Sequence, residues 1–113
     1  MMTFDVADRD GVAVLALSGD LMGGPDGAAL HDQLQQLKAN GRRQVVVDLD
    51  GVRLMNSSGL GMLIGALTTM RNAGGDLRLA RVAERVQSLL MITKLAAIFQ
   101  HYDTVEEAVA SFQ

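Results

Sequence analysis

Three polar residues, Asn56, Ser57 and Ser58, separate a valine-rich segment from a glycine-rich apolar segment in the stretch VVVDLDGVRLMNSSGLGMLIGAL, residues 45–67. A serine hydroxyl at such a junction could serve two kinds of chemistry. It could attack a substrate after a neighbouring base has taken its proton, or it could receive a phosphoryl group from another enzyme. The residue types around the two serines help to decide between these roles.

The surroundings of the serines disfavour a catalytic nucleophile. The elbow of serine hydrolases has the pattern G-x-S-x-G, but the residues two positions before Ser57 and Ser58 are methionine and asparagine. A triad also needs a histidine held by a carboxylate. The chain has only His31 and His101, and neither has an evident route to the serines, so we expect both to face solvent. We therefore expect no catalytic residue and no enzymatic activity.

Nucleotide and metal sites are disfavoured as well. The segment GLGMLIG is close to the dinucleotide pattern G-x-G-x-x-G, but its third glycine comes one position late and no G-K-[ST] occurs. Asp48 and Asp50 flank Leu49, and two carboxylates without a third ligand are more typical of turn and solubility roles than of a metal site. The chain has no cysteine. The sequence thus predicts no cofactor and no metal.

The composition limits which classes of protein this chain can belong to. The net charge is −3, the basic residues are scattered and aromatic residues make up 4%, which disfavours nucleic-acid binding. No apolar run approaches the ~18 residues of a membrane span, and the acidic N-terminus is unlike a signal peptide. There is no linker or internal repeat. We expect one domain over residues 1–113, located in the cytoplasm without direct membrane insertion.

The segments that position the serines alternate between strand and helix patterns. TFDVA and VAVLALSG are predicted strands, and the short turn DRDG between them favours antiparallel pairing. GGPDGAALHDQLQQLKANG is a predicted helix with Pro25 at its first position and with an apolar face formed by Leu30, Leu34 and Leu37. The apolar, β-branched run in QVVVDLDGV predicts a central parallel strand that is covered on both faces.

The second half of the chain continues the alternation. The helix after the serines has a buried stripe of Leu60, Leu63, Ile64, Leu67 and Met70. DLRLARV is a predicted strand, AERVQSLLMI a helix, AIFQHY a short last strand, and DTVEEAVASF a helix with a capping box from Thr104 to Glu107. The fold class is α/β, in the order β-β-α-β-α-β-α-β-α, with a mixed, mostly parallel sheet of about five strands and four helices.

The local pattern leaves two explanations for the serines open. Asn56 is a good N-cap, so Ser57 and Ser58 fall in the first helical turn, where backbone N–H groups are unpaired and the helix dipole is positive. A phosphate of about −1.5 to −2 charges is tolerated there. The alternative is that both serines simply begin a helix.

The glycines of this helix require a reason of their own. Gly59, Gly61 and Gly65 each cost roughly 1 kcal/mol relative to alanine inside a helix. One explanation is that Gly61 and Gly65 let the helix approach the sheet. Another is that Gly59, beside the serines, leaves an open surface for a partner, and both can apply.

These residues resemble the STAS-domain family of bacterial anti-sigma factor antagonists. The resemblance rests on VVVDLDGVRLMNSSGLGMLIGAL followed by NAGGDLRLARVAERVQSLL, and it extends over essentially the whole chain, including VAVLALSGDL and TVEEAVASF. It implies a single STAS-like domain. It also implies that an anti-sigma factor serine kinase phosphorylates Ser57, that only the unphosphorylated chain binds this kinase, and that a serine phosphatase removes the phosphate.

The resemblance also carries a docking surface to this sequence. The residues that would border it are Asn56, Ser58, Gly59 and Leu60, with Asp20 and Leu21 as a second edge. The family commonly has aspartate where Asn56 stands, and Lys94 stands where such proteins often turn on a glycine, so we expect a local adjustment there. We expect a monomer or weak homodimer. A second interpretation is a STAS scaffold module that is not phosphorylated, in a stress-signalling or membrane-transport complex.

Overall fold

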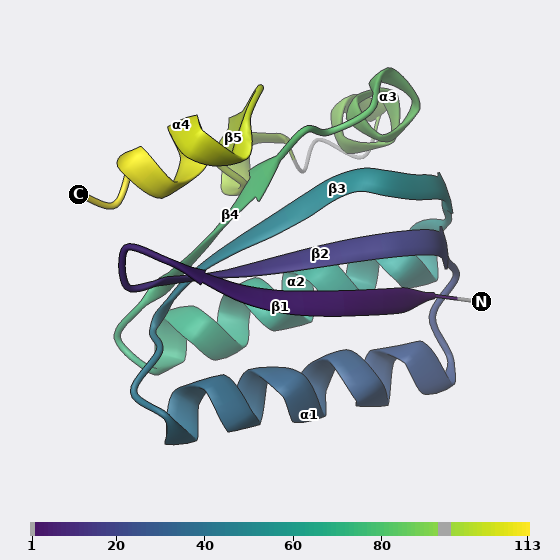
Figure 1. Ribbon diagram of the computed structural model, residues 1–113. Coiled ribbons are helices and arrows are strands. Elements are labelled where there is room, and N and C mark those ends of the chain that lie inside the picture. Colours follow the sequence, from purple (N-terminus) through teal and green to yellow (C-terminus); the bar gives the residue numbers. More distant parts are fainter. Residues whose placement is uncertain (1, 93–95) are drawn as a thin grey trace.

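One mixed sheet forms the centre of the computed structural model, which describes residues 2–92 and 96–113 (Figure 1). The strands are β1 (Thr3–Arg9), β2 (Val12–Leu21), β3 (Gln44–Met55), β4 (Asp76–Ala80) and β5 (His101–Tyr102). The helices are α1 (Pro25–Ala39), α2 (Ser57–Asn72), α3 (Glu84–Ile92) and α4 (Val105–Ala110), with a 3₁₀ turn, η1, at Ala96–Ile98. The predicted fold class and element order are therefore confirmed.

The strands lie in the order β1-β2-β3-β4-β5. β1 pairs antiparallel with β2, and the other neighbouring pairs are parallel, as the turn DRDG and the later alternation predict. β1 is an edge strand, and its side chains are exposed apart from the half-buried Phe4. β3 is the central strand, but β4 ends opposite Asp48, so the carboxyl end of β3, which leads into the serines, pairs with β2 alone among the described strands.

The sheet has a separate apolar core on each face. α1 and α2 lie below the sheet in Figure 1 and α4 lies above it. Along β3, Val45 and Val47 belong to the larger core that α1, α2 and α3 share, whereas Val46 packs with the smaller core under α4. Because successive side chains of a strand point to opposite faces, a fully apolar run suits a strand covered on both sides. This prediction is confirmed.

The helix ends follow their local signals. Pro25 is the first residue of α1, and Leu30, Leu34 and Leu37 are buried. After α1 the chain turns at Gly41, whose φ of 81° suits glycine. At the start of α4, the Oγ1 atom of Thr104 accepts a hydrogen bond from the N–H of Glu107 at 3.0 Å, as the capping box predicts.

The last predicted strand is much shorter in the structure. Only His101 and Tyr102 pair with β4, and the alanine-rich segment Ala96–Ile98 forms a 3₁₀ turn instead. Alanine has little preference for strands, and Phe99 is buried in the larger core directly after the turn. The prediction of a strand over residues 97–102 is therefore wrong for its first four residues. Lys94 lies outside the described residues.

A half-buried ion pair joins the middle of β3 to the residue that follows β4. The carboxylate of Asp48, 6% exposed, accepts hydrogen bonds from Nε of Arg81 at 3.0 Å and from its Nη2 at 2.6 Å. Arg81 has a φ of 54°, a left-handed conformation that costs free energy in a residue with a side chain. The hydrogen bond that Arg81 donates to Asp48 is the main cause that raises the pKa of Arg81. A solubility role for Asp48 is therefore wrong, because its side chain shares the covered face of β3 with Val46.

We predict that Asp48→Asn lowers the free energy of unfolding by about 1–2 kcal/mol, because it weakens a bidentate, charge-assisted hydrogen bond. The value is modest because the Arg81 side chain is 44% exposed and water screens the pair. Urea denaturation would measure it. Asp50→Asn is the matched control: its carboxylate is 3.5 Å from Arg81 and 64% exposed, so a change below about 0.5 kcal/mol is expected. Equal losses in both variants would contradict the prediction.

Candidate functional site

The junction between β3 and α2 is fixed by Asn56. This residue has an extended backbone, and its Oδ1 atom accepts a hydrogen bond from the N–H of Gly59 at 2.8 Å. Its own N–H donates to the carbonyl of Leu21 at 3.3 Å, and its carbonyl accepts from Leu60 at 2.9 Å. The prediction that Asn56 caps the helix is confirmed, and the cap is attached to the end of β2 as well.

Ser57 and Ser58 are the first two residues of α2, and both are exposed. Their backbone N–H groups precede the first full turn, so no helix carbonyl lies one turn earlier to accept from them. The positive end of the helix dipole is at the same place. The side chain of Ser57 is thus open to a visiting protein, beside a helix terminus that favours anions.

The loop between β2 and α1 lies against the serines. A Cβ atom on Gly23 would be only 2.7 Å from the Cβ of Ser58, so this loop backbone and the start of α2 are in close contact. Met22, at the same loop, is 47% exposed. The sequence interpretation named Asp20 and Leu21 in this region but missed Met22 and Gly23. The Gly-Gly pair before Pro25 is the signal that could have indicated a close approach.

The residues expected to border a docking surface come together, but at different depths. Ser57 and Ser58 are exposed, Asn56 and Asp20 are half-buried, and three are buried: Leu21, Gly59 and Leu60. The carboxylate of Asp20 pairs with the guanidinium of Arg53 at 3.3–3.4 Å. The buried residues therefore shape the surface from beneath. The side chains that a partner can reach include the serines, Met22, Leu54, which is 37% exposed, and Arg53, which is 77% exposed.

The glycines of α2 have roles opposite to those expected. A Cβ on Gly59 would overlap the carbonyl of Leu21, whereas a Cβ on Gly61 or Gly65 would meet nothing within 4 Å. The helix therefore approaches the sheet at Gly59, and Gly61 and Gly65 are exposed. The expectation that Gly61 and Gly65 allow the approach is wrong, because they lie on the outer face of the helix. Gly61 and Gly65, about one and two helical turns after Ser57, therefore leave the open surface.

Groups that could activate a serine are located elsewhere. His31 is exposed in α1 and makes a side-chain contact with Gln35 at 3.3 Å, and His101 is exposed in β5. In the part of the chain that the structure describes, no three His, Cys, Asp or Glu side chains are grouped to hold a metal ion. Among the same residues, no helix has the length and hydrophobicity to span a membrane.

The comparisons with known proteins agree with this geometry. The family model described as the STAS domain matches residues 3–108. A Thermotoga neapolitana protein named as a homologue of TM1081 is 33% identical over 73 residues, 65% of each chain. The anti-sigma-B factor antagonist of Staphylococcus aureus is 32% identical over 66 residues, 58% of this chain and 61% of that protein. The matched part spans less than two thirds of each relative's length.

Solved structures share the fold along nearly the whole chain. An anti-sigma factor antagonist from Mycobacterium paratuberculosis has a TM-score of 0.82 at 24% identity and covers 98% of this chain and 93% of its own. The phosphorylated form of the Bacillus cell fate determinant SpoIIAA has a TM-score of 0.74 at 17% identity, covering 98% and 100%. A sulfate transporter family protein from Wolinella succinogenes has a TM-score of 0.79 at 16% identity, covering 93% and 87%.

We predict that alanine has opposite effects at the glycines of α2. Gly59→Ala should lower the free energy of unfolding by at least about 2 kcal/mol, because the new methyl group collides with backbone that cannot turn aside. Gly61→Ala and Gly65→Ala should each raise it by about 0.5–1 kcal/mol, because alanine is the better helix former and the space is open. Thermal and urea unfolding of the three variants would measure this, and stabilisation by Gly59→Ala would contradict the close approach.

Proposed function

This chain belongs to the STAS-domain family, and we propose that it acts as an anti-sigma factor antagonist whose binding is switched by phosphorylation of Ser57. The observation that carries the proposal is the exposure of Ser57 at the first position of α2. A hydroxyl there can enter the active site of a kinase while the rest of the fold stays intact. The chain needs no base of its own, because the kinase supplies the catalysis.

The names of similar proteins support this proposal. The S. aureus relative is an anti-sigma-B factor antagonist, and the Bacillus SpoIIAA structure of the same fold is in a phosphorylated form. In the proposed cycle, the unphosphorylated chain binds an anti-sigma factor serine kinase and thereby frees a sigma factor for transcription. Phosphorylation ends this binding, and a serine phosphatase restores it. The cycle takes place in the cytoplasm.

The charges around Ser57 explain why a phosphate would end binding. The first turn of α2, residues 57–60, contains no basic side chain, and the nearby guanidinium of Arg53 is already paired with Asp20. The accessible neighbours Met22 and Leu54 are apolar. A dianion buried in such an interface loses its water without gaining a cationic partner, which costs several kcal/mol. Each 1.4 kcal/mol lowers affinity about tenfold.

A second candidate is a scaffold module that is not phosphorylated, in a stress-signalling or membrane-transport complex. The likeness to the W. succinogenes sulfate transporter family protein favours it. In that case Ser57 and Ser58 serve only as the first residues of α2. The two candidates differ in one measurable property, because only the first requires a covalent change at Ser57 that alters binding.

We predict that an anti-sigma factor kinase from the same organism adds one phosphate to the chain, at Ser57, in the presence of ATP. Mass spectrometry should find the phosphate in the wild type and in Ser58→Ala, which is the matched control one residue away, but not in Ser57→Ala. Calorimetry without ATP should show that the phosphorylated chain binds the kinase about 100-fold or more weakly than the unmodified chain.

Ser57→Asp tests the same switch without ATP and without the phosphorylation step. It places a negative charge at the helix start and should weaken kinase binding, whereas Ser57→Ala should bind nearly as well as the wild type. If a kinase of demonstrated activity leaves Ser57 unmodified, and Ser57→Asp binds as tightly as the wild type, the switch is refuted and the scaffold function is favoured.

A further inference from the structure

Met22 combines an exposed, oxidisable side chain with a place beside the start of α2. It is 47% exposed, and Met91, at the end of α3, is 71% exposed. The other described methionines are buried or half-buried: Met2, Met55, Met62 and Met70. Met91 lies elsewhere, where it lines a small hollow together with His101 of β5. An oxidant in solution therefore reaches Met22 and Met91 before the methionines inside the fold.

The backbone on both sides of Met22 is held against α2. The carbonyl of Leu21 lies so close to Gly59 that a Cβ there would overlap it, and a Cβ on Gly23 would be 2.7 Å from the Cβ of Ser58. In Figure 1 this loop runs from β2 to α1 at the end of the sheet where β3 leads into α2. Met22 is thus placed next to the first turn of α2 before any partner binds.

An exposed apolar side chain on a fixed backbone is suited to pack against an apolar surface of a partner. The fixed backbone lowers the conformational entropy that is lost on association, and removal of the methionine side chain from water stabilises a complex. Asp20, two residues before Met22, is already paired with Arg53 at 3.3 Å. The contact that Met22 offers is therefore apolar, and it depends on the side chain staying apolar.

We propose that Met22 is an oxidation-sensitive contact for the anti-sigma factor kinase, and that its conversion to the sulfoxide weakens kinase binding without phosphorylation of Ser57. The inference rests on the proposed function, because the kinase is the partner whose binding is weakened. The oxidant is a peroxide. The thioether sulfur attacks one peroxide oxygen, the O–O bond breaks and an S–O bond forms. The sulfur gives up two electrons, and from hydrogen peroxide the other oxygen leaves as water.

The sulfoxide turns the tip of Met22 from apolar to polar. In the free chain its oxygen accepts hydrogen bonds from water, and docking against an apolar surface removes that water without supplying a donor. The effect is smaller than that of a phosphate at Ser57, because the sulfoxide has no net charge. Met22 belongs to neither apolar core, so the oxidised chain should keep the stability of the untreated chain.

The test compares kinase binding by calorimetry, without ATP, before and after the chain alone is treated with hydrogen peroxide, which is removed before mixing. Mass spectrometry identifies the methionines that have gained an oxygen, and urea denaturation checks that the oxidised chain is folded. The oxidised wild type should bind about tenfold more weakly than the untreated chain. Met22→Gln, which carries a polar side chain of similar length, should show a similar loss without peroxide.

Met22→Leu and Met91→Leu form the matched pair of variants. Leucine is apolar, of similar size and resistant to peroxide, so Met22→Leu should bind like the wild type and keep its affinity after treatment. Met91→Leu should lose affinity after treatment as the wild type does. In addition, bound kinase should slow the oxidation of Met22 and leave that of Met91 unchanged.

Equal losses of affinity in the treated Met22→Leu variant and the treated wild type would overturn the inference. So would an undiminished affinity of the folded chain with Met22 in the sulfoxide form. Either result is compatible with phosphorylation of Ser57, which mass spectrometry would still detect after incubation with kinase and ATP. An active kinase that neither binds nor phosphorylates the untreated chain would instead refute the proposed function, and this inference with it.

Discussion

The contact between the backbone of Gly59 and the carbonyl of Leu21 determines where α2 lies on the sheet. No side chain fits between them, so the first turn of α2 meets the end of β2 directly. Asn56 completes the contact, because its N–H also donates to the carbonyl of Leu21 while its side chain caps Gly59. The exposure of Ser57 fits this arrangement: Gly59 and Leu60 take the buried face of the first turn, and Ser57 and Ser58, which precede them, lie on the exposed face.

The elements and the cap could be predicted from local chemistry, whereas the roles of individual residues depended on the tertiary structure. Valines in β3, the leucines of α1 and the asparagine at the start of α2 each have one strong preference, and the fold satisfies all of them. Glycine has no such preference. Whether Gly59 or Gly61 faces the sheet depends on the orientation of the helix about its axis. The predicted apolar stripe already puts Gly61 and Gly65 on the opposite face, but the close approach at Gly59 depends on where the end of β2 lies. Asp48 is similar, because its partner Arg81 is 33 residues away.

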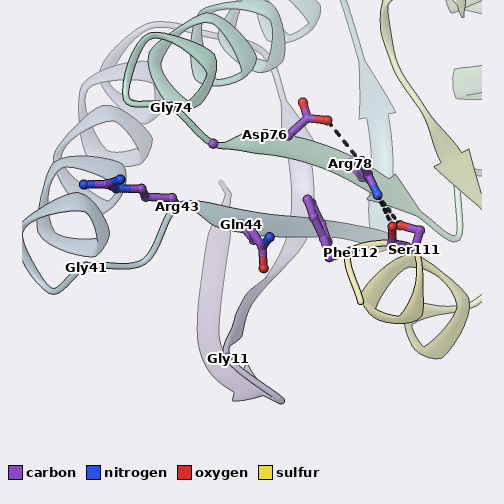
Figure 2. A pocket seen from close by; sticks show the side chains of 10 residues that line it. Gly11, Gly41, Arg43, Gln44, Gly74, Asp76, Arg78, Ser111 and Phe112 are labelled. Carbon is purple, nitrogen blue, oxygen red and sulfur yellow. Dashed lines mark hydrogen bonds and ion pairs between the residues drawn. The ribbon is translucent and has the colours of Figure 1, made fainter.

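The two ends of the sheet have different chemical characters. At the carboxyl ends of the parallel strands, exposed hydroxyls and apolar side chains surround an unpaired helix start, which suits contact with a protein. At the other end, the glycine-containing turns before β3 and β4, together with Asp76, Arg78 and Phe112, line a hollow of about 400 Å³ (Figure 2). α2 connects them: Ser57 is its first residue, and Arg71, in its last turn, pairs with the aspartate that lines the hollow.

β1 has a consequence for how copies of this chain meet. It is an edge strand, and no strand of the described residues pairs with its outer backbone groups. Such an edge can recruit an identical strand from another molecule. Its exposed side chains include Asp5, Asp8 and Arg9. A second copy that paired with this edge would remove water from these charged side chains, which opposes the growth of a continuous intermolecular sheet. The same strand that closes one side of the fold thereby limits aggregation.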